Sequence, residues 1–526
     1  MEHLGLGYLA AILRQNDYKV EIVDANLLQW DTRKTIDEIS RKNFDMIGIS
    51  MYQQALDVAI EIARNVKRKN DIHVTVGCHF PTFTFNELLA KYGCIDFVVL
   101  GEGEYTLLEL TKSIENGDRL DGVLGIAYRD KNGTIKVNSP RKLIENLDDL
   151  PFPSRDTLSI LKKNVVKRFS DIFLDRPIDQ RALERIAFAS ILSSRGCHGN
   201  CSFCSIRSFY GTSAGLAWRA RNPTNVINEI EHLMNEHDAK YFFFTDADFI
   251  GPGRIGRDRA RKFALEIHER GLEIEYGINC RPDNVDRELL SALKKSGLRH
   301  IYLGVESGIQ RALKTFNKNI TVEQSKRAIR NIRKLNLSMK IGFILFDPYI
   351  TLQEVRKNYE FLEDTDFLDF DLLVTKLVVF CGSPIEKELR DDRLIQGTEL
   401  MPEYKFIHPE ISNLLKLLTE YQKMTCSLRR RLRPIRDLTS RKEVPSEHIR
   451  LLLSMLERRE SSREQLHTFE TIYDQLKKLD NCYFEEAIRF VQEEEIDVGQ
   501  FLRKFKQAFD LVLARARILG VTLPRP

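Results

Sequence analysis

The chain has 526 residues, a formal net charge of +4, 43% hydrophobic residues and 30% charged residues. This length exceeds one ordinary core and predicts about three domains of roughly 150 residues each. The composition is that of a globular protein, and no apolar run reaches the roughly 18 residues of a membrane span. The nine cysteines are too scattered for a disulfide scaffold, and the N-terminus lacks a signal-peptide pattern, so we expect a reducing, cytoplasmic environment.

The first 125 residues alternate short apolar strands with helical patterns. The expected strands are 19–23, 46–50, 74–76 and 97–100. Repeated strand–helix units predict an α/β domain with a flavodoxin-like parallel sheet over residues 1–125.

A hairpin and a linker are expected over residues 126–185. Asn132-Gly133 stands between two short β-like runs, which is typical of a tight hairpin turn. Pro151 and Pro153 follow an acidic pair and indicate an extended segment.

A second strand–helix series occupies residues 186–395. The expected strands are 188–192, 241–245, 275–279, 300–305, 340–346 and 372–380. Six such units predict a partial (β/α)6 barrel of the TIM type. Beyond it the β pattern fades, and residues 396–526 are predicted to form a helical C-terminal domain. The basic run 429–436 has no interleaved aromatic residues, so we interpret it as a solvated helix end and expect no nucleic-acid partner.

Three cysteines, Cys197, Cys201 and Cys204, lie within eight residues directly after the first strand of the second series. Thiolates are the usual ligands of iron–sulfur clusters, and three of them leave one iron of a cubane open to a small molecule. Loops that follow barrel strands are also where barrel active sites lie. A zinc site is the alternative, but zinc usually takes four ligands, and His198 is awkwardly placed to be the fourth.

The pattern CxxxCxFC after a strand resembles the radical S-adenosylmethionine superfamily, and the resemblance covers roughly residues 186–390. It implies a [4Fe-4S] cluster on the three cysteines, with S-adenosylmethionine bound at the open iron. It also implies that Phe203 of the cysteine loop packs near the adenine, and that S-adenosylmethionine is contacted at successive strand ends by Asp246, Arg281, Glu306, Ser307 and Phe343. Each of these residues also has a plainer interpretation, such as a helix cap for Asp246 or a surface ion pair for Arg281.

The N-terminal domain resembles the cobalamin-binding domain that precedes the barrel in one large radical subfamily. The resemblance rests on the segment Leu4-Gly5-Leu6-Gly7-Tyr8 and on two glycine turns, 77–82 and 101–104. It implies a cobalamin site built from Ser50, Gly77, His79, Thr82, Glu102 and Gly103. Strand ends of this kind are where ligands bind in parallel sheets, although any flavodoxin-like sheet has tight turns there.

The sequence departs from that family in two ways, which change what we expect of cobalamin binding and of the start of the domain. The motif Asp-x-His-x-x-Gly is absent, so we expect cobalamin to bind without a histidine on the lower face of cobalt. Relatives have a strand and a proline-containing loop before the Leu-Gly-Leu-Gly-Tyr segment, whereas this chain starts there. We therefore expect either a longer natural chain or a domain without its first strand.

The resemblance implies a methyltransferase. In that chemistry a 5′-deoxyadenosyl radical takes hydrogen from an unactivated carbon, which then receives a methyl group from cobalamin. Natural-product intermediates and peptides are the expected substrates, and flavodoxin or ferredoxin is the expected electron donor. Cyclisation or rearrangement with the same cofactors is the alternative, and a noncatalytic cobalamin or cluster sensor is a hypothesis from another class. A methylthiotransferase would need a second cysteine triad, but only Cys78 and Cys94 are available in the N-terminal domain.

Overall fold

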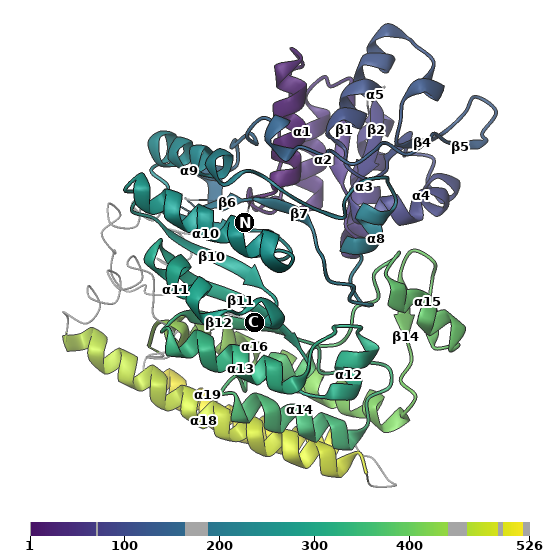
Figure 1. The fold of residues 1–526 in the computed structure, drawn as a ribbon. Coiled ribbons are helices and arrows are strands. Elements are labelled where there is room, and N and C mark those ends of the chain that lie inside the picture. Colours follow the sequence, from purple (N-terminus) through teal and green to yellow (C-terminus); the bar gives the residue numbers. More distant parts are fainter. Residues whose placement is uncertain are drawn as a thin grey trace.

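The computed structural model describes residues 2–69, 72–161, 163, 188–439, 460–492 and 498–518. An N-terminal sheet domain packs beside a central sheet, and long C-terminal helices lie along the central domain (Figure 1). Parts of the predicted linker (162 and 164–185) and of the predicted helical domain (440–459, 493–497 and 519–526), with the first two residues of the predicted barrel, fall outside the described residues. Among the helices that are described, none is long and apolar enough to cross a bilayer.

The first sheet has five strands in the order β1-β2-β3-β4-β5. The first three strands pair in parallel, and the last two add an antiparallel hairpin at the edge. The strands are β1 (Met46–Ser50), β2 (His73–Gly77), β3 (Phe97–Val99), β4 (Ile126–Arg129) and β5 (Ile135–Val137). The helices are α1 (Leu4–Gln15), α2 (Thr32–Ser40), α3 (Leu56–Lys69), α4 (His79–Lys91) and α5 (Glu104–Asn116). The flavodoxin-like parallel sheet and the Asn-Gly hairpin are therefore confirmed.

The predicted strand 19–23 is wrong. These residues have no ladder pairing, and β1 is the edge strand of the described sheet. A strand forms only where a neighbouring strand satisfies its backbone groups. One carbonyl of the segment, that of Val20, accepts instead from the side chain of Arg14 at 2.7 Å.

The second sheet has five parallel strands in the order β12-β11-β10-β9-β6. The strands are β6 (Phe188–Ile191), β9 (Tyr241–Phe244), β10 (Glu275–Cys280), β11 (Leu298–Glu306) and β12 (Ser338–Phe343). The helices are α9 (Pro223–His237), α10 (Gly253–Glu269), α11 (Arg287–Lys295), α12 (Gln310–Thr315), α13 (Val322–Lys334) and α14 (Leu352–Asp364). Local sequence fixes several helix starts, because Thr321 and Thr351 both form capping boxes. The partial barrel is confirmed.

The sixth strand, expected over 372–380, is wrong. Its first residues form a 3-10 turn (Leu372–Val374), and one isolated bridge joins Phe346 to Lys376. The rest of the segment crosses to the N-terminal domain, where the Gln53 side chain donates to Val379 O at 2.9 Å and accepts from Cys381 N at 3.0 Å. Backbone hydrogen bonds join Thr375 and Leu377 to Leu345 and Phe346, so the segment keeps only a short contact with the sheet before it crosses to the other domain.

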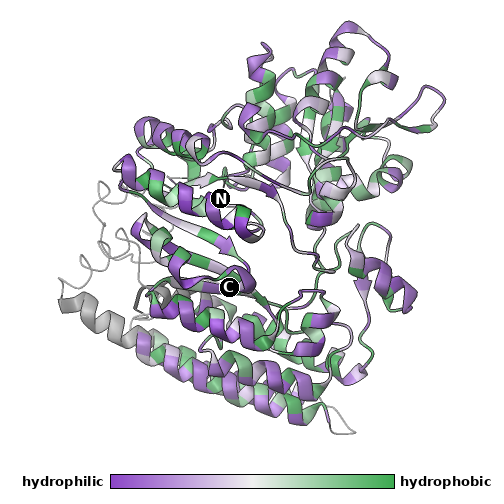
Figure 2. Ribbon diagram, viewed as in Figure 1, coloured by the Kyte–Doolittle hydropathy of each residue, from purple (hydrophilic) through white to green (hydrophobic). Residues whose placement is uncertain are grey.

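The C-terminal part is helical, as predicted. After α15 (Pro384–Asp391) and a short hairpin, β13 (Ile395–Gly397) with β14 (Pro402–Tyr404), come the helices α16 (Pro409–Thr439), α18 (Glu460–Phe490) and α19 (Val498–Ile518). Hydrophobic and hydrophilic residues alternate along them (Figure 2). Their apolar side chains continue the barrel core, for example where Phe484 stacks on Tyr359 of α14 with 4.4 Å between ring centroids. The basic run 429–436 lies near the end of α16, and its Arg429 is paired with the buried Asp480 and only 12% exposed rather than solvated.

Candidate active site

The three cysteines lie on the loop that connects two short antiparallel strands. Strands β7 (Ser194–Gly196) and β8 (Trp218–Ala220) pair antiparallel, and α8 (Ile206–Gly211) lies inside the loop between them. Gly196 has a φ of +80°, and a Cβ there would lie 1.6 Å from the carbonyl oxygen of Ala217. Only glycine fits this close approach, which brings the two ends of the cysteine loop together.

The thiol groups of the loop are partly buried and form no disulfide. Burial raises the pKa of Cys197 and raises the pKa of Cys204 to about 11. Such thiols become thiolates when a metal binds them. Within the described parts of the chain, no three Cys, His, Asp or Glu side chains gather as the ligands of a single ion would. A cubane places each thiolate on a different iron and needs only three of them, whereas zinc usually takes four ligands.

Two cations lie beside the central cysteine. Arg281 Nη1 is 3.5 Å from Cys201 Sγ, while its Nη2 donates to Lys318 O at 2.8 Å. The buried Lys318 lies 2.9 Å through Nζ from Glu306 Oε1. Burial opposes the charge of Lys318, but Glu306 and Cys201 outweigh it and raise the pKa of the lysine. Lys318 could not be recognised from the sequence, because a lone lysine after a short helix carries no motif.

Of the other predicted residues on the barrel, Glu306 contacts Lys318, whereas Ser307, Phe343 and Phe203 pack against other side chains. Glu306 ends β11 with a φ of +67°, and its carbonyl accepts from Ile344 N at 2.7 Å. Ser307 is fully buried and donates to Asn358 Oδ1 at 3.1 Å. Phe343 stacks on Phe361 at 6.0 Å, and Phe203 meets Phe316 edge-on at 5.4 Å.

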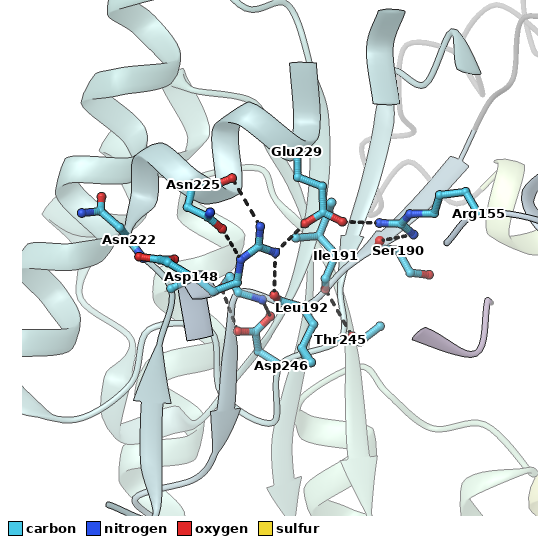
Figure 3. Close-up of polar contacts among 12 residues, drawn as sticks. Asp148, Arg155, Ser190, Ile191, Leu192, Asn222, Asn225, Glu229, Thr245 and Asp246 are labelled. Carbon is cyan, nitrogen blue, oxygen red and sulfur yellow. Dashed lines mark hydrogen bonds and ion pairs between the residues drawn. The ribbon is translucent and has the colours of Figure 1, made fainter. Parts of the chain in front are cut away.

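Asp246 lies next to a group of hydrogen-bonded side chains that connects the linker to the barrel. Its Oδ1 accepts from Ser193 Oγ at 2.7 Å and also from Ser194 Oγ. Figure 3 shows Asp246 beside this network, in which Glu229 of α9 accepts from Arg155 of the linker at 2.5 Å. The role predicted for Asp246 in holding S-adenosylmethionine stays a prediction.

Asp248, two residues further on, has a different environment that the sequence did not single out. Burial raises the pKa of its carboxyl to about 7, although Arg281 nearby opposes this shift. Its Oδ2 accepts from Asn284 Nδ2 at 2.7 Å and lies 3.4 Å from Nδ1 of His198. A titratable carboxyl thus lies behind the cysteine loop.

The predicted cobalamin residues meet at one edge of the first sheet. Ser50 and Gly77 end β1 and β2, which pair there, and Thr82 Oγ1 accepts from Gly101 N at 3.1 Å. Ser50 Oγ lies 2.9 Å from Nε2 of His3, a residue that the sequence analysis did not assign.

His79 faces the cysteine loop across the domain boundary. Its ring stacks on Phe209 of α8 with 4.0 Å between centroids and a 29° interplanar angle. Burial lowers the pKa of His79 to about 4, so the ring is neutral near pH 7. Its Nε2 is buried and has no hydrogen-bond partner among the described residues. A buried polar atom of this kind fits a site for a further group, as cobalamin would be.

Glu102 and Gly103, also predicted at the cobalamin site, have other contacts. Glu102 lies 2.9 Å from Arg195 and 2.9 Å from Arg219 of the cysteine-loop hairpin. A Cβ on Gly103 would lie 3.3 Å from both Leu9 and Val99, so this glycine permits close packing at the start of α5.

The comparisons with known proteins match both halves of this site. The radical SAM superfamily model matches residues 191–362, and the B12-binding domain model matches residues 1–111. An uncharacterized methyltransferase of Pyrococcus horikoshii is 32% identical over 373 residues, which are 70% of this chain and 75% of that protein. An anaerobic magnesium-protoporphyrin IX monomethyl ester cyclase of Rubrivivax gelatinosus is 29% identical over 367 residues, 68% of this chain and 61% of that protein.

A solved structure shares the fold over nearly the whole chain. The cobalamin-dependent S-adenosylmethionine radical enzyme OxsB with aqua-cobalamin bound has a TM-score of 0.70 and 19% identity, and the match covers 98% of this chain and 78% of that one. With both family models in place and the cysteine loop facing the first sheet, the chain belongs to the cobalamin-binding radical S-adenosylmethionine enzymes, whose cofactors are a [4Fe-4S] cluster, S-adenosylmethionine and cobalamin.

Proposed function

We propose that the protein transfers a methyl group to an unactivated carbon of a natural-product or peptide substrate. The observation that carries the proposal is the stacking of His79 on Phe209 at 4.0 Å. It brings the ligand-binding edge of the first sheet against the helix that follows Cys204. A methyl donor and a radical source that act on one carbon must lie on either side of it, and adjacent sites provide that geometry. The relative from Pyrococcus horikoshii, which is named a methyltransferase, supports the same reaction.

On the barrel side, Cys197, Cys201 and Cys204 would each hold one iron. When bound, the cluster and S-adenosylmethionine supply the radical chemistry, and cobalamin supplies the methyl carrier. Lys318 and Arg281 present charged donors that would bind the carboxylate of S-adenosylmethionine. The further residues that we assign to this cofactor are Phe203, Asp246, Glu306, Ser307 and Phe343.

On the sheet side, Ser50, Gly77, His79 and Thr82 would hold cobalamin. Gly77 gives the macrocycle close access to the backbone at the end of β2. His79 offers its unpaired Nε2 as a donor or acceptor. Because the ring is neutral, it adds no charge beside the cofactor.

The reaction also needs a substrate and a reductant. We assign the reductant to flavodoxin or ferredoxin and the enzyme to the cytoplasm, where thiols stay reduced. Cyclisation or rearrangement is the second candidate, because the relative from Rubrivivax gelatinosus is named a cyclase.

The products distinguish these candidates. The anaerobically reconstituted holoenzyme is reduced with dithionite and incubated with S-adenosylmethionine carrying a ¹³C methyl group and with a metabolite extract from cells that lack the gene. Methyl transfer predicts a ¹³C-labelled product, with S-adenosylhomocysteine formed beside 5′-deoxyadenosine. Formation of 5′-deoxyadenosine and a new product without S-adenosylhomocysteine would favour cyclisation or rearrangement, and no cleavage at all would favour a sensor.

A further inference from the structure

Two arginines stand opposite each other on the hairpin that carries the cysteine loop. Arg195 of β7 pairs with Arg219 of β8 in the antiparallel register. Their side chains are only 7% and 4% exposed. Like charges directly opposite across a ladder repel each other, and burial strengthens the repulsion. The hairpin therefore needs a negative partner between the two guanidinium groups.

Glu102, from the turn after β3 of the first sheet, is that partner. Its Oε1 lies 2.9 Å from Arg195 Nη1 and 3.1 Å from Arg219 Nη2, and its Oε2 lies 2.9 Å from Arg219 Nη1. The backbone N–H of Ile144 donates to the same Oε2 at 2.7 Å. Burial alone would raise the pKa of Glu102, but the two arginines outweigh it and lower the pKa. The carboxylate is thus charged, and these four donors occupy both of its oxygens.

Further contacts hold the same arginines in place. Glu104 Oε1 lies 2.5 Å from Arg195 Nη2. The Arg195 guanidinium lies over the ring of Tyr8 at 5.2 Å, and the Arg219 guanidinium lies over the ring of Tyr210 at 5.1 Å. Because Tyr210 belongs to α8, the contacts extend into the cysteine loop itself.

The place of Glu102 in the chain connects the two cofactor sites. The turn that carries it follows β3, at the edge of the sheet where β1 and β2 end in Ser50 and Gly77. Arg195, which it holds, is two residues before Cys197. A single carboxylate therefore links the cobalamin edge to the start of the cysteine loop.

We propose that Glu102 is a positioning residue that sets the separation between the cluster and cobalamin. It acts through Arg195 and Arg219 and binds neither cofactor itself. The inference goes beyond the proposed methyl transfer, because it holds for any reaction that uses both cofactors together.

The test is a magnetic distance measurement on the reduced holoprotein. With the cluster in its one-electron-reduced state and cobalamin as Co(II), each carries an unpaired electron, and their coupling falls steeply with separation. We expect one narrow coupling in the wild type and a broadened or shifted coupling, changed at least twofold, in Glu102→Gln. Iron content and cobalamin content should stay within twofold of the wild type.

Matched variants show whether the effect belongs to this carboxylate. Glu104→Gln removes the second carboxylate that contacts Arg195 and leaves Glu102 in place, so we expect a smaller change in the magnetic coupling than in Glu102→Gln. Glu102→Asp, which keeps the charge, should lie nearer the wild type than Glu102→Gln. Asp156→Asn breaks the ion pair with Arg14 at 2.6 Å, away from the hairpin, and should leave the coupling unchanged.

Two results would overturn the proposal. One is an unchanged coupling in fully loaded Glu102→Gln, and the other is loss of cobalamin with iron retained, which would make Glu102 a cofactor ligand. If Glu102→Gln does not fold, Arg219→Lys carries the test. Lysine keeps the charge but cannot form the two-pronged bond to the carboxylate. An altered coupling in Arg219→Lys supports the proposal, and an unchanged one contradicts it.

Discussion

The ammonium group of Lys318 lies 2.9 Å from Glu306 Oε1, and the two side chains are only 5% and 13% exposed. This pair joins the loop after α12 to the end of β11, and Cys201 is close enough to act on the charge of Lys318. Removing one partner of a buried ion pair leaves the other charge buried and unpaired, which lowers stability. Removing both partners often changes the free energy of unfolding very little.

We therefore predict that Lys318→Met lowers the free energy of unfolding by about 3 to 5 kcal/mol. The Lys318→Met/Glu306→Gln double variant should recover much of that loss, because no stranded charge remains. Denaturant unfolding of the apoprotein measures the free energy of unfolding of the single and of the double variant. Equal losses in the single and the double variant would show that the two side chains are not coupled.

The hairpin that carries the cysteines should not tolerate a side chain at Gly196. Gly196→Ala places a methyl group where the Ala217 carbonyl lies, so the ends of the loop must separate. We expect iron incorporation on anaerobic reconstitution to fall by more than half. Gly211→Ala is the matched control, because nothing lies within 4 Å of a Cβ there, and it should load normally. Normal iron loading in Gly196→Ala would contradict this description of the loop.

The lowered pKa of His79 predicts a pH dependence of stability. Burial lowers its pKa from 6.5 to about 4. Between these values the unfolded chain binds the proton and the folded chain does not, so stability falls as the pH falls through this window. The full effect of this one residue is about 3 kcal/mol at most. Comparing the unfolding free energies at pH 7 and pH 4.5 for the wild type and His79→Gln measures the contribution of His79 alone. A difference between the two pH values that is the same in both proteins would show that His79 is not held neutral.

Local pattern predicted the features that depend on neighbouring residues. The spacing of Cys197, Cys201 and Cys204 after an apolar strand predicted the cysteine loop, and Asn132-Gly133 predicted the hairpin. Alternating strands and helices gave both sheets, because each parallel strand needs a crossover helix.

Features that depend on distant residues could not be predicted in this way. Nothing local in 372–380 shows that this segment leaves the sheet, or that the Gln53 side chain binds the backbone at Val379 and Cys381. The partners of Glu102 on β7 and β8 are 93 and 117 residues away in the chain. Lys318 becomes notable only once folding places it beside Glu306 and Cys201.

The central claim is that the cysteine loop and the first sheet form one site with two cofactors. The most direct measurement compares the wild type with a Cys197→Ala/Cys201→Ala/Cys204→Ala variant after anaerobic reconstitution, with Cys482→Ala as the control. Iron, cobalamin and the 5′-deoxyadenosine formed from S-adenosylmethionine on reduction are quantified for each.

We expect the wild type and Cys482→Ala to hold about four irons and one cobalamin per chain and to form 5′-deoxyadenosine. The triple variant should keep its cobalamin and its helical circular dichroism but lose the iron and the cleavage. Cleavage that persists in the triple variant, or a wild type that retains no cobalamin, would contradict the account.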